Sequence, residues 1–181
     1  PLRKEAAGMK RTLCIRPLCR ADYGRCKELM AQVHALHVQN RPDLFRAASP
    51  ETLAAYYRDE LAEGERLSAV AERDGVPVGA CLVSVKTQAK GQTILAGRSI
   101  ACVEALCVAQ SCRGQGIGTS LMRWVAERAA ALGLDSVELS VYAFNNSVRS
   151  LYEGLGFQVK SYHMEYLRNI KREERNEHDL L

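Results

Sequence analysis

The amino-acid sequence predicts a single α/β domain. Short apolar runs of strand length alternate along the chain with longer, helix-like runs. In the longer runs, apolar residues recur every three or four positions. The chain has 181 residues, which is enough for one sizeable core, and it contains no internal repeat or linker. Apolar residues make up 47% and charged residues 25% of the sequence, as in ordinary globular proteins.

The first half of the chain predicts one strand, two helices and a hairpin. A serine followed by a proline is a good helix start, because the first caps the helix and the second fits its first position. An Asp-Gly pair between two apolar runs is a hairpin signal. These signals place a strand at 12–16, a helix from Ala21, a helix from Ser49-Pro50, and a hairpin of 67–72 and 76–86 around Asp74-Gly75.

The second half predicts further alternation of strands and helices. Gly133 follows a helical run and is expected to stop that helix. The expected elements are a loop at 86–98, strands at 100–108 and 135–141, helices at 119–132 and 145–153, and a last strand pair around 158–167. Residues 1–8 are expected to be an extension that contributes little to the fold, 9–168 the domain, and 169–181 a charged tail.

Charge and composition argue against several classes of protein. The net charge of +4 comes from scattered basic residues, whereas a nucleic-acid binder concentrates them on one face. No apolar run is long enough for a membrane helix, and the start lacks a secretory signal. Seven cysteines without a C-x-x-C pair indicate reduced thiols and a cytoplasmic protein. The four histidines lack zinc-site spacing, so no metal is expected.

A glycine-rich stretch, Cys112-Arg-Gly-Gln-Gly-Ile-Gly-Thr119, lies between an apolar strand and a helix. A strand that enters a glycine turn and then a helix directs several unpaired N–H groups toward one point, which favours an anion such as a phosphate. The spacing fits neither a P-loop nor a dinucleotide fingerprint. A turn whose glycines only permit tight packing is the simpler alternative.

A second motif, Asn145-Asn-Ser-Val-Arg-Ser-Leu-Tyr-Glu-Gly-Leu-Gly-Phe157, follows downstream. Together with Glu104-Ala-Leu-Cys-Val108 and the glycine stretch, it resembles the GCN5-related N-acetyltransferase (GNAT) superfamily, and bacterial small-molecule and amine acetyltransferases within it. The second motif differs from the family pattern at one position, where Val148 replaces the usual alanine. The resemblance covers the region 100–157 well and the first helices loosely.

The resemblance implies a fold, a cofactor and a cofactor site. The fold has a central, mixed, mostly antiparallel sheet of about seven strands flanked by helices. The sheet is splayed between parallel strands at 100–108 and 136–142, and acetyl-CoA, the acetyl donor, lies in that gap. The residues implied in cofactor binding are the strand residues Leu106, Cys107 and Val108, the loop residues Arg113, Gly114, Gln115, Gly116, Ile117, Gly118 and Thr119, and Asn145.

The implied reaction is direct attack of a primary amine on the acetyl group of acetyl-CoA. Tyr152 matches the family's general acid, because a phenol is protonated at neutral pH and can donate a proton to the departing thiolate. Glu104 is the candidate base, either directly or through a water relay. Because Glu104 precedes Leu106 by two residues, strand alternation predicts that both side chains share one face.

Several alternatives stay open. The acceptor amine can belong to a polyamine, an aminoglycoside, an amino acid or a protein N-terminus. A non-catalytic acetyl-CoA-binding or sensing module is the alternative function. Neither a nucleic acid nor a membrane is an expected partner, and a homodimer is an option because dimers are common in the family.

Overall fold

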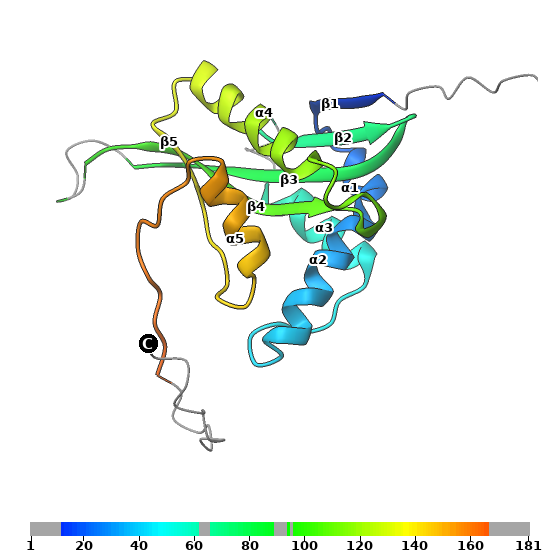
Figure 1. Cartoon of the computed structure of the whole chain (residues 1–181), viewed down its shortest axis with the longest axis horizontal. Helices are drawn as coiled ribbons and strands as arrows, with labels where there is room; N and C mark the ends of the chain where they lie inside the picture. Colours follow the sequence, from blue (N-terminus) through cyan, green and yellow to red (C-terminus); the bar gives the residue numbers. More distant parts are fainter. Residues whose placement is uncertain (1–11, 62–65, 89–93, 95, 167–181) are drawn as a thin grey trace, which may run out of the picture.

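The computed structural model describes residues 12–61, 66–88, 94 and 96–166, which form one β-sheet with helices on both faces (Figure 1). The predicted alternation of strands and helices is confirmed in these ranges. The elements are β1 (Leu13–Pro17), α1 (Asp22–Arg25), α2 (Lys27–Asn40), α3 (Pro50–Glu60), β2 (Ala69–Arg73), β3 (Val76–Thr87), β4 (Ser99–Val108), α4 (Ile117–Ala131), β5 (Ser136–Leu139) and α5 (Asn146–Gly154).

The sheet has the strand order β1-β2-β3-β4-β5. The pairs β1–β2, β2–β3 and β3–β4 are antiparallel. The pair β4–β5 is parallel, as predicted for the two strands on either side of the glycine loop. The parallel pairing is short, because it begins at Ile100 opposite Ser136 and ends at Val103 opposite Leu139. Beyond Val103, β4 continues to Val108, and among the described strands it pairs there with β3 alone.

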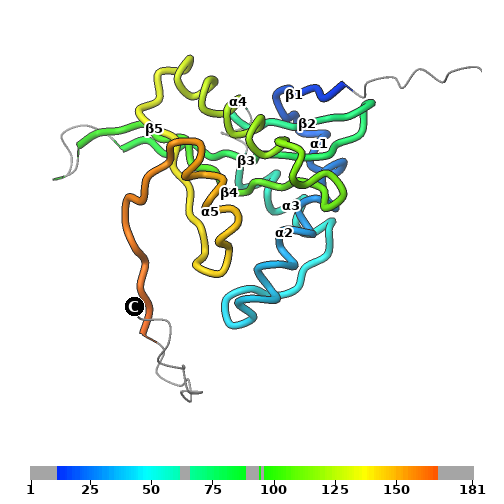
Figure 2. Tube along the Cα trace, viewed as in Figure 1, coloured from blue at the N-terminus to red at the C-terminus, as the bar shows by residue number. Residues whose placement is uncertain are grey.

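Each face of the sheet carries its own hydrophobic core. One core contains the buried face of α4 (Leu121, Val125) and Tyr152 of α5. The other core is built on the opposite face by the N-terminal helices, with Tyr23, Met30 and Leu53 at its centre. Figure 2 shows α1, α2 and α3 grouped on one side of the sheet and α4 on the other. The protein therefore has the three-layer arrangement typical of an α/β domain.

The capping, helix-stop and turn residues predicted from the sequence adopt the expected local structures. The Ser49 hydroxyl accepts a hydrogen bond from the Thr52 N–H at 3.2 Å, so the predicted cap of α3 is confirmed. Gly133 has a φ of +71°, the left-handed geometry with which a glycine ends α4. Asp74 and Gly75 form the turn between β2 and β3 with positive φ angles.

Other expectations differ from the structure. The helix from Ala21 is interrupted at Cys26 and forms α1 and α2, α4 starts at residue 117 rather than 119, and β5 is shorter than predicted. The described residues form five strands instead of about seven. Residues 158–166 do not form the expected last strand pair, because their backbone has no ladder with another described residue. Residue 167 and both expected terminal segments, 1–8 and 169–181, lie outside the described ranges.

A buried carboxylate joins β1, α1 and β2 at one edge of the sheet. Asp22 is 1% exposed, and its two oxygens accept hydrogen bonds from the Arg16 guanidinium at 2.7 and 2.8 Å. Asp22 also accepts from the Cys19 N–H at 2.9 Å and from Arg25 at 2.8 Å, and Glu72 of β2 binds both arginines. The Arg16 guanidinium holds the pKa of the Asp22 carboxyl well below its usual range.

We expect Asp22→Asn to destabilise the protein by about 2–3 kcal/mol. The amide carries no charge, so Arg16 and Arg25 lose the ion pairs that they form with the Asp22 carboxylate. The lowered pKa means that Asp22 stabilises the folded state above its unfolded pKa of about 4, and that this contribution is lost as the pH falls further. Urea denaturation at pH 7 and at pH 3 measures both effects, and the variant should lose less stability on acidification than the original protein.

Asp59→Asn is the matched control, because Asp59 is exposed and its salt bridge within the described residues is to the neighbouring Arg58. Its urea midpoint should not change measurably. Equal midpoints for Asp22→Asn and Asp59→Asn at pH 7 would contradict the structural role given to Asp22.

Candidate active site

The glycine-rich stretch forms a loop that ends in the N-terminus of α4. Gly114 and Gly116 have φ angles of +72° and +77°, a region that other residues enter only with strain. Gly116 is the N-cap of α4, and no side chain caps the helix there. The first helical hydrogen bond runs from the Ser120 N–H to the Gly116 carbonyl, so the N–H groups of residues 117–119 have no acceptor within the helix. This helix end can bind an anion.

The end of β4 lies beside this loop with one edge free of β5. Within the part of the chain that the structure describes, Leu106, Cys107 and Val108 pair with β3 and not with β5. Leu106 and Val108 point toward the core that contains α4 and α5, while Cys107 is fully buried on the opposite face. Burial raises the pKa of the Cys107 thiol to about 12, so the thiol stays protonated and acts as a small hydrophobic side chain.

Glu104 forms a β-bulge, and this overturns one prediction. Leu82 pairs with Ala105 and Val83 pairs with Val103, so Glu104 has no partner on β3. Ala101 and Val103 before the bulge belong to the core with α4, whereas Ala105 and Cys107 after it belong to the core with α2. The alternation of side chains therefore changes phase at Glu104.

The Glu104 side chain lies on the face of α2 and α3. Its carboxylate accepts a hydrogen bond of 2.6 Å from Ser84 Oγ and lies 3.6 Å from the Lys86 ammonium. Ser84 follows Val83, which points to the α4 face, so Ser84 and Glu104 share the opposite face. The prediction that Glu104 and Leu106 share one face is wrong, because it assumed a strand without a bulge.

Tyr152 lies on α5 and packs into the core with α4. It is 7% exposed, and its ring centroid is 5.7 Å from that of Phe157. Burial raises the pKa of the Tyr152 phenol above its ordinary value, with smaller contributions from Cys81 and Cys107. The hydroxyl therefore stays protonated at neutral pH and can act only as a proton donor there.

The loop, the end of β4 and α5 meet at Gly118. A Cβ atom at Gly118 would lie 3.7 Å from Leu106 Cδ2, 3.8 Å from Val108 Cγ2 and 3.9 Å from Leu151 Cδ1. Asn145 is the N-cap residue of α5, and its side chain makes no cap hydrogen bond. The structure thus brings most of the predicted cofactor residues together and places Glu104 on the other face of the sheet.

Two polar side chains of the loop are engaged within the protein. Arg113 Nε donates to the Val108 carbonyl at 3.2 Å. Gln115 Nε2 donates to the Ser111 carbonyl at 3.2 Å, and its Oε1 accepts from Arg73 Nη2 at 3.0 Å. Arg73 therefore braces the loop from the end of β2. Sequence reasoning missed Arg73, because no local signal marks a contact that spans 42 residues.

Four partly buried rings join the end of α2 to the loop before α5. The His37 ring centroid lies 5.1 Å from Phe45, 5.4 Å from Tyr142 and 5.7 Å from Phe144. Tyr142 and Phe144 stack on each other with an interplanar angle of 16°. This aromatic cluster, His37, Phe45, Tyr142 and Phe144, holds the segment that leads into Asn145.

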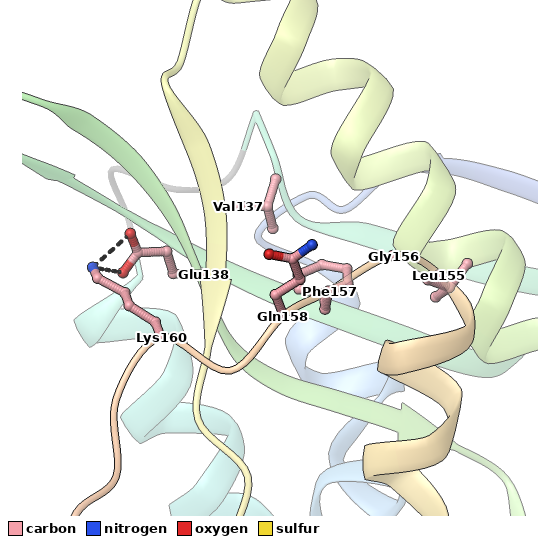
Figure 3. A pocket seen from close by; sticks show the side chains of 7 residues that line it. All are labelled: Val137, Glu138, Leu155, Gly156, Phe157, Gln158 and Lys160. Carbon is pink, nitrogen blue, oxygen red and sulfur yellow. Dashed lines mark hydrogen bonds and ion pairs between the residues drawn. The ribbon is translucent and has the colours of Figure 1, made fainter.

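The described residues contain a pocket outside the predicted site. It is a hollow of about 360 Å³ beside β5, lined by Val137, Glu138, Leu155, Gly156, Phe157, Gln158 and Lys160 (Figure 3). Within the described ranges, no three His, Cys, Asp or Glu side chains gather where they could hold a metal ion. No described helix is long and apolar enough to cross a membrane.

The sequence profile of the Acetyltransferase (GNAT) family matches residues 30–157, which is well over half of the chain. A thialysine N-epsilon-acetyltransferase from Bos taurus is 34% identical over 84 residues, covering 46% of this chain and 49% of that protein. The chain spans about half or less of the length of the curated relatives that it matches.

Two solved structures share the fold. The tetramutant of the BH1408 protein from Bacillus halodurans has a TM-score of 0.71 and 26% identity, with 85% of this chain and 99% of that chain covered. The aminoglycoside N-acetyltransferase AAC(6')-Iy in complex with CoA has a TM-score of 0.67 and 17% identity, with 91% and 99% covered. The second likeness concerns the fold alone.

Proposed function

Because this chain belongs to the acetyltransferase (GNAT) family, we propose that it is an acetyl-CoA-dependent N-acetyltransferase that acts on a primary amine. One observation carries the proposal. The free edge of β4 ends beside an uncapped helix N-terminus, so a strand edge and an anion site lie next to each other. CoA has the matching chemistry, with an amide-containing pantetheine arm and a pyrophosphate.

The cofactor uses backbone groups for most of its binding. The pantetheine arm pairs with Leu106, Cys107 and Val108 like an added strand. The pyrophosphate accepts hydrogen bonds from the loop and from the first N–H groups of α4, where the helix dipole favours negative charge. Asn145, whose side chain makes no cap bond, hydrogen-bonds the pantetheine arm. Gln115 positions the loop, because its own polar atoms are engaged by Arg73 and Ser111.

The transfer step needs a proton donor at the sulfur. The amine nitrogen bonds to the thioester carbonyl carbon, the carbon–sulfur bond breaks, and the sulfur takes a proton from the Tyr152 hydroxyl. The amine loses one proton in this step and the sulfur gains one from Tyr152, so the number of protons is balanced. A backbone N–H near Val108 stabilises the negative charge that develops on the carbonyl oxygen.

Glu104 serves the amine from the other face of the sheet. An amine with a pKa near 10 must lose a proton before it attacks, and a carboxylate accepts that proton directly or through water. The bulge directs Glu104 toward α2 and α3, so the acceptor approaches from the side of the N-terminal helices while Tyr152 serves the leaving sulfur from the side of α5. The name of the bovine relative also specifies transfer to an amine nitrogen.

We expect Gly116→Glu to weaken acetyl-CoA binding at least tenfold, about 1.4 kcal/mol, because a carboxylate at the loop repels the pyrophosphate. Gly133→Glu is the matched control. Both glycines have φ near +75° with open space around them, and Gly133 lies at the far end of α4. Isothermal titration calorimetry should show weaker binding for the first variant only. Equal affinities would contradict the proposed phosphate site.

We expect Tyr152→Phe to lower kcat about 100-fold with little change in the KM for acetyl-CoA, because the thiolate then leaves without its proton donor. Thiol release in steady-state assays measures both constants. Tyr23→Phe is the control, since Tyr23 is also buried, at 1% exposed, but lies in the core of the other face. An unchanged kcat for Tyr152→Phe across the pH range would exclude Tyr152 as the general acid.

A further inference from the structure

Arg73 contacts the glycine loop before α4 from a distant part of the sheet. It is the last residue of β2, and its Nη2 donates to Gln115 Oε1 at 3.0 Å. Gln115 Nε2 in turn donates to the Ser111 carbonyl, directly before the loop, at 3.2 Å. These two hydrogen bonds form a brace, Arg73–Gln115–Ser111, that holds the Gln115 side chain from both ends.

The fold places Arg73 near the start of α4. Ala71, two residues earlier on β2, belongs to the core with α4, and Gly79 of β3 pairs with it. A Cβ atom at Gly79 would lie 3.0 Å from Ile117 Cγ2, so the first turn of α4 packs directly on the sheet there. Because alternate side chains of a strand share a face, Arg73 lies on the α4 face as well. Figure 1 shows the β2–β3 turn and the glycine loop at the same end of the sheet.

This position of Arg73 is unfavourable for folding. Its guanidinium contacts Gln115, which directly precedes the N-cap of α4, and the start of a helix carries partial positive charge. Arg73 Nε is buried and has no hydrogen-bond partner among the described residues, which destabilises a folded state. The hydrogen bond to Gln115 is exposed, so it offsets little of this cost. A residue that costs stability in this way is typical of a functional site.

We propose that Arg73 is a positioning residue for acetyl-CoA, which holds the glycine loop in its binding conformation through Gln115. The inference rests on the proposed function, because it requires that the loop binds the pyrophosphate. Gly114 and Gly116 give an unbraced loop many conformations. Fixing the loop before the cofactor arrives removes an entropic cost from binding. The brace therefore contributes to the affinity for the cofactor and not to the transfer step.

Isothermal titration calorimetry with acetyl-CoA tests the brace. We expect Arg73→Met and Gln115→Met each to raise the dissociation constant about fivefold to tenfold, the range expected for one lost hydrogen bond. Because the two side chains act as one unit, the double variant should bind within about twofold of either single variant. Gln115 carries no charge, so weaker binding of Arg73→Met alone would assign the effect to the charge of Arg73 and overturn the proposal.

Arg128→Met is the matched control. Arg128 is an exposed cation in the last turn of α4. It lies about 16 Å along the helix from Ile117, beyond the screening length of about 8 Å at physiological ionic strength, so its removal should leave the affinity unchanged. Steady-state assays of thiol release should show a raised KM for acetyl-CoA and an unchanged kcat for both brace variants. A lowered kcat with an unchanged KM would contradict a role in positioning the cofactor.

Urea denaturation without cofactor separates this role from a structural one. We expect the midpoint of Arg73→Met to equal or exceed that of the original protein, because methionine fills the space of the apolar stem and removes the unpaired donor. A lower midpoint would make Arg73 a structural residue and overturn the proposal. Equal affinities of the original protein and both brace variants would overturn this proposal alone. An original protein that does not bind acetyl-CoA would overturn the proposed function together with it.

Discussion

The short pairing of β4 with β5 is the constraint on which the site depends. The two strands stay together only to Val103 and Leu139, and the bulge at Glu104 follows at once. A bulge bends its strand and increases the local twist, so β4 leaves β5 where the bulge begins. One extra residue therefore both opens the edge of β4 and changes the direction of the side chains beyond it.

The open edge acquires its chemistry from the elements packed around it. The glycine loop follows β4 directly and presents the uncapped start of α4, while α5 closes the same face with Tyr152 in the core. Glu104 points to the opposite face, where the N-terminal helices pack. In the proposed reaction this separation is useful, because Glu104 accepts the proton of the attacking amine on one face. Tyr152 donates a proton to the departing sulfur on the other face. Burial keeps Tyr152 protonated for its part.

The features that could be predicted from the sequence are those set by neighbouring residues. The Ser49 cap, the Asp74-Gly75 turn, the Gly133 helix stop and the glycine loop each depend on a few adjacent positions. The direction of Glu104 could not be predicted, because it depends on the register against β3, some twenty residues away in the chain. The contact of Arg73 with Gln115 could not be predicted for the same reason, because the two residues are 42 positions apart. The segment 158–166 has the pattern of a strand, but a strand also needs a partner, and pattern alone does not supply one.

Thermal unfolding with and without acetyl-CoA tests most directly whether the free β4 edge and the start of α4 form a cofactor site. A ligand that binds only the folded state adds about 2.7 kcal/mol of stability at a hundredfold excess over its dissociation constant. The proposed site predicts a clear upward shift of the midpoint with acetyl-CoA, and a smaller one in Gly116→Glu. An unchanged midpoint at saturating concentrations would contradict the account, because the fold would then be present without its cofactor.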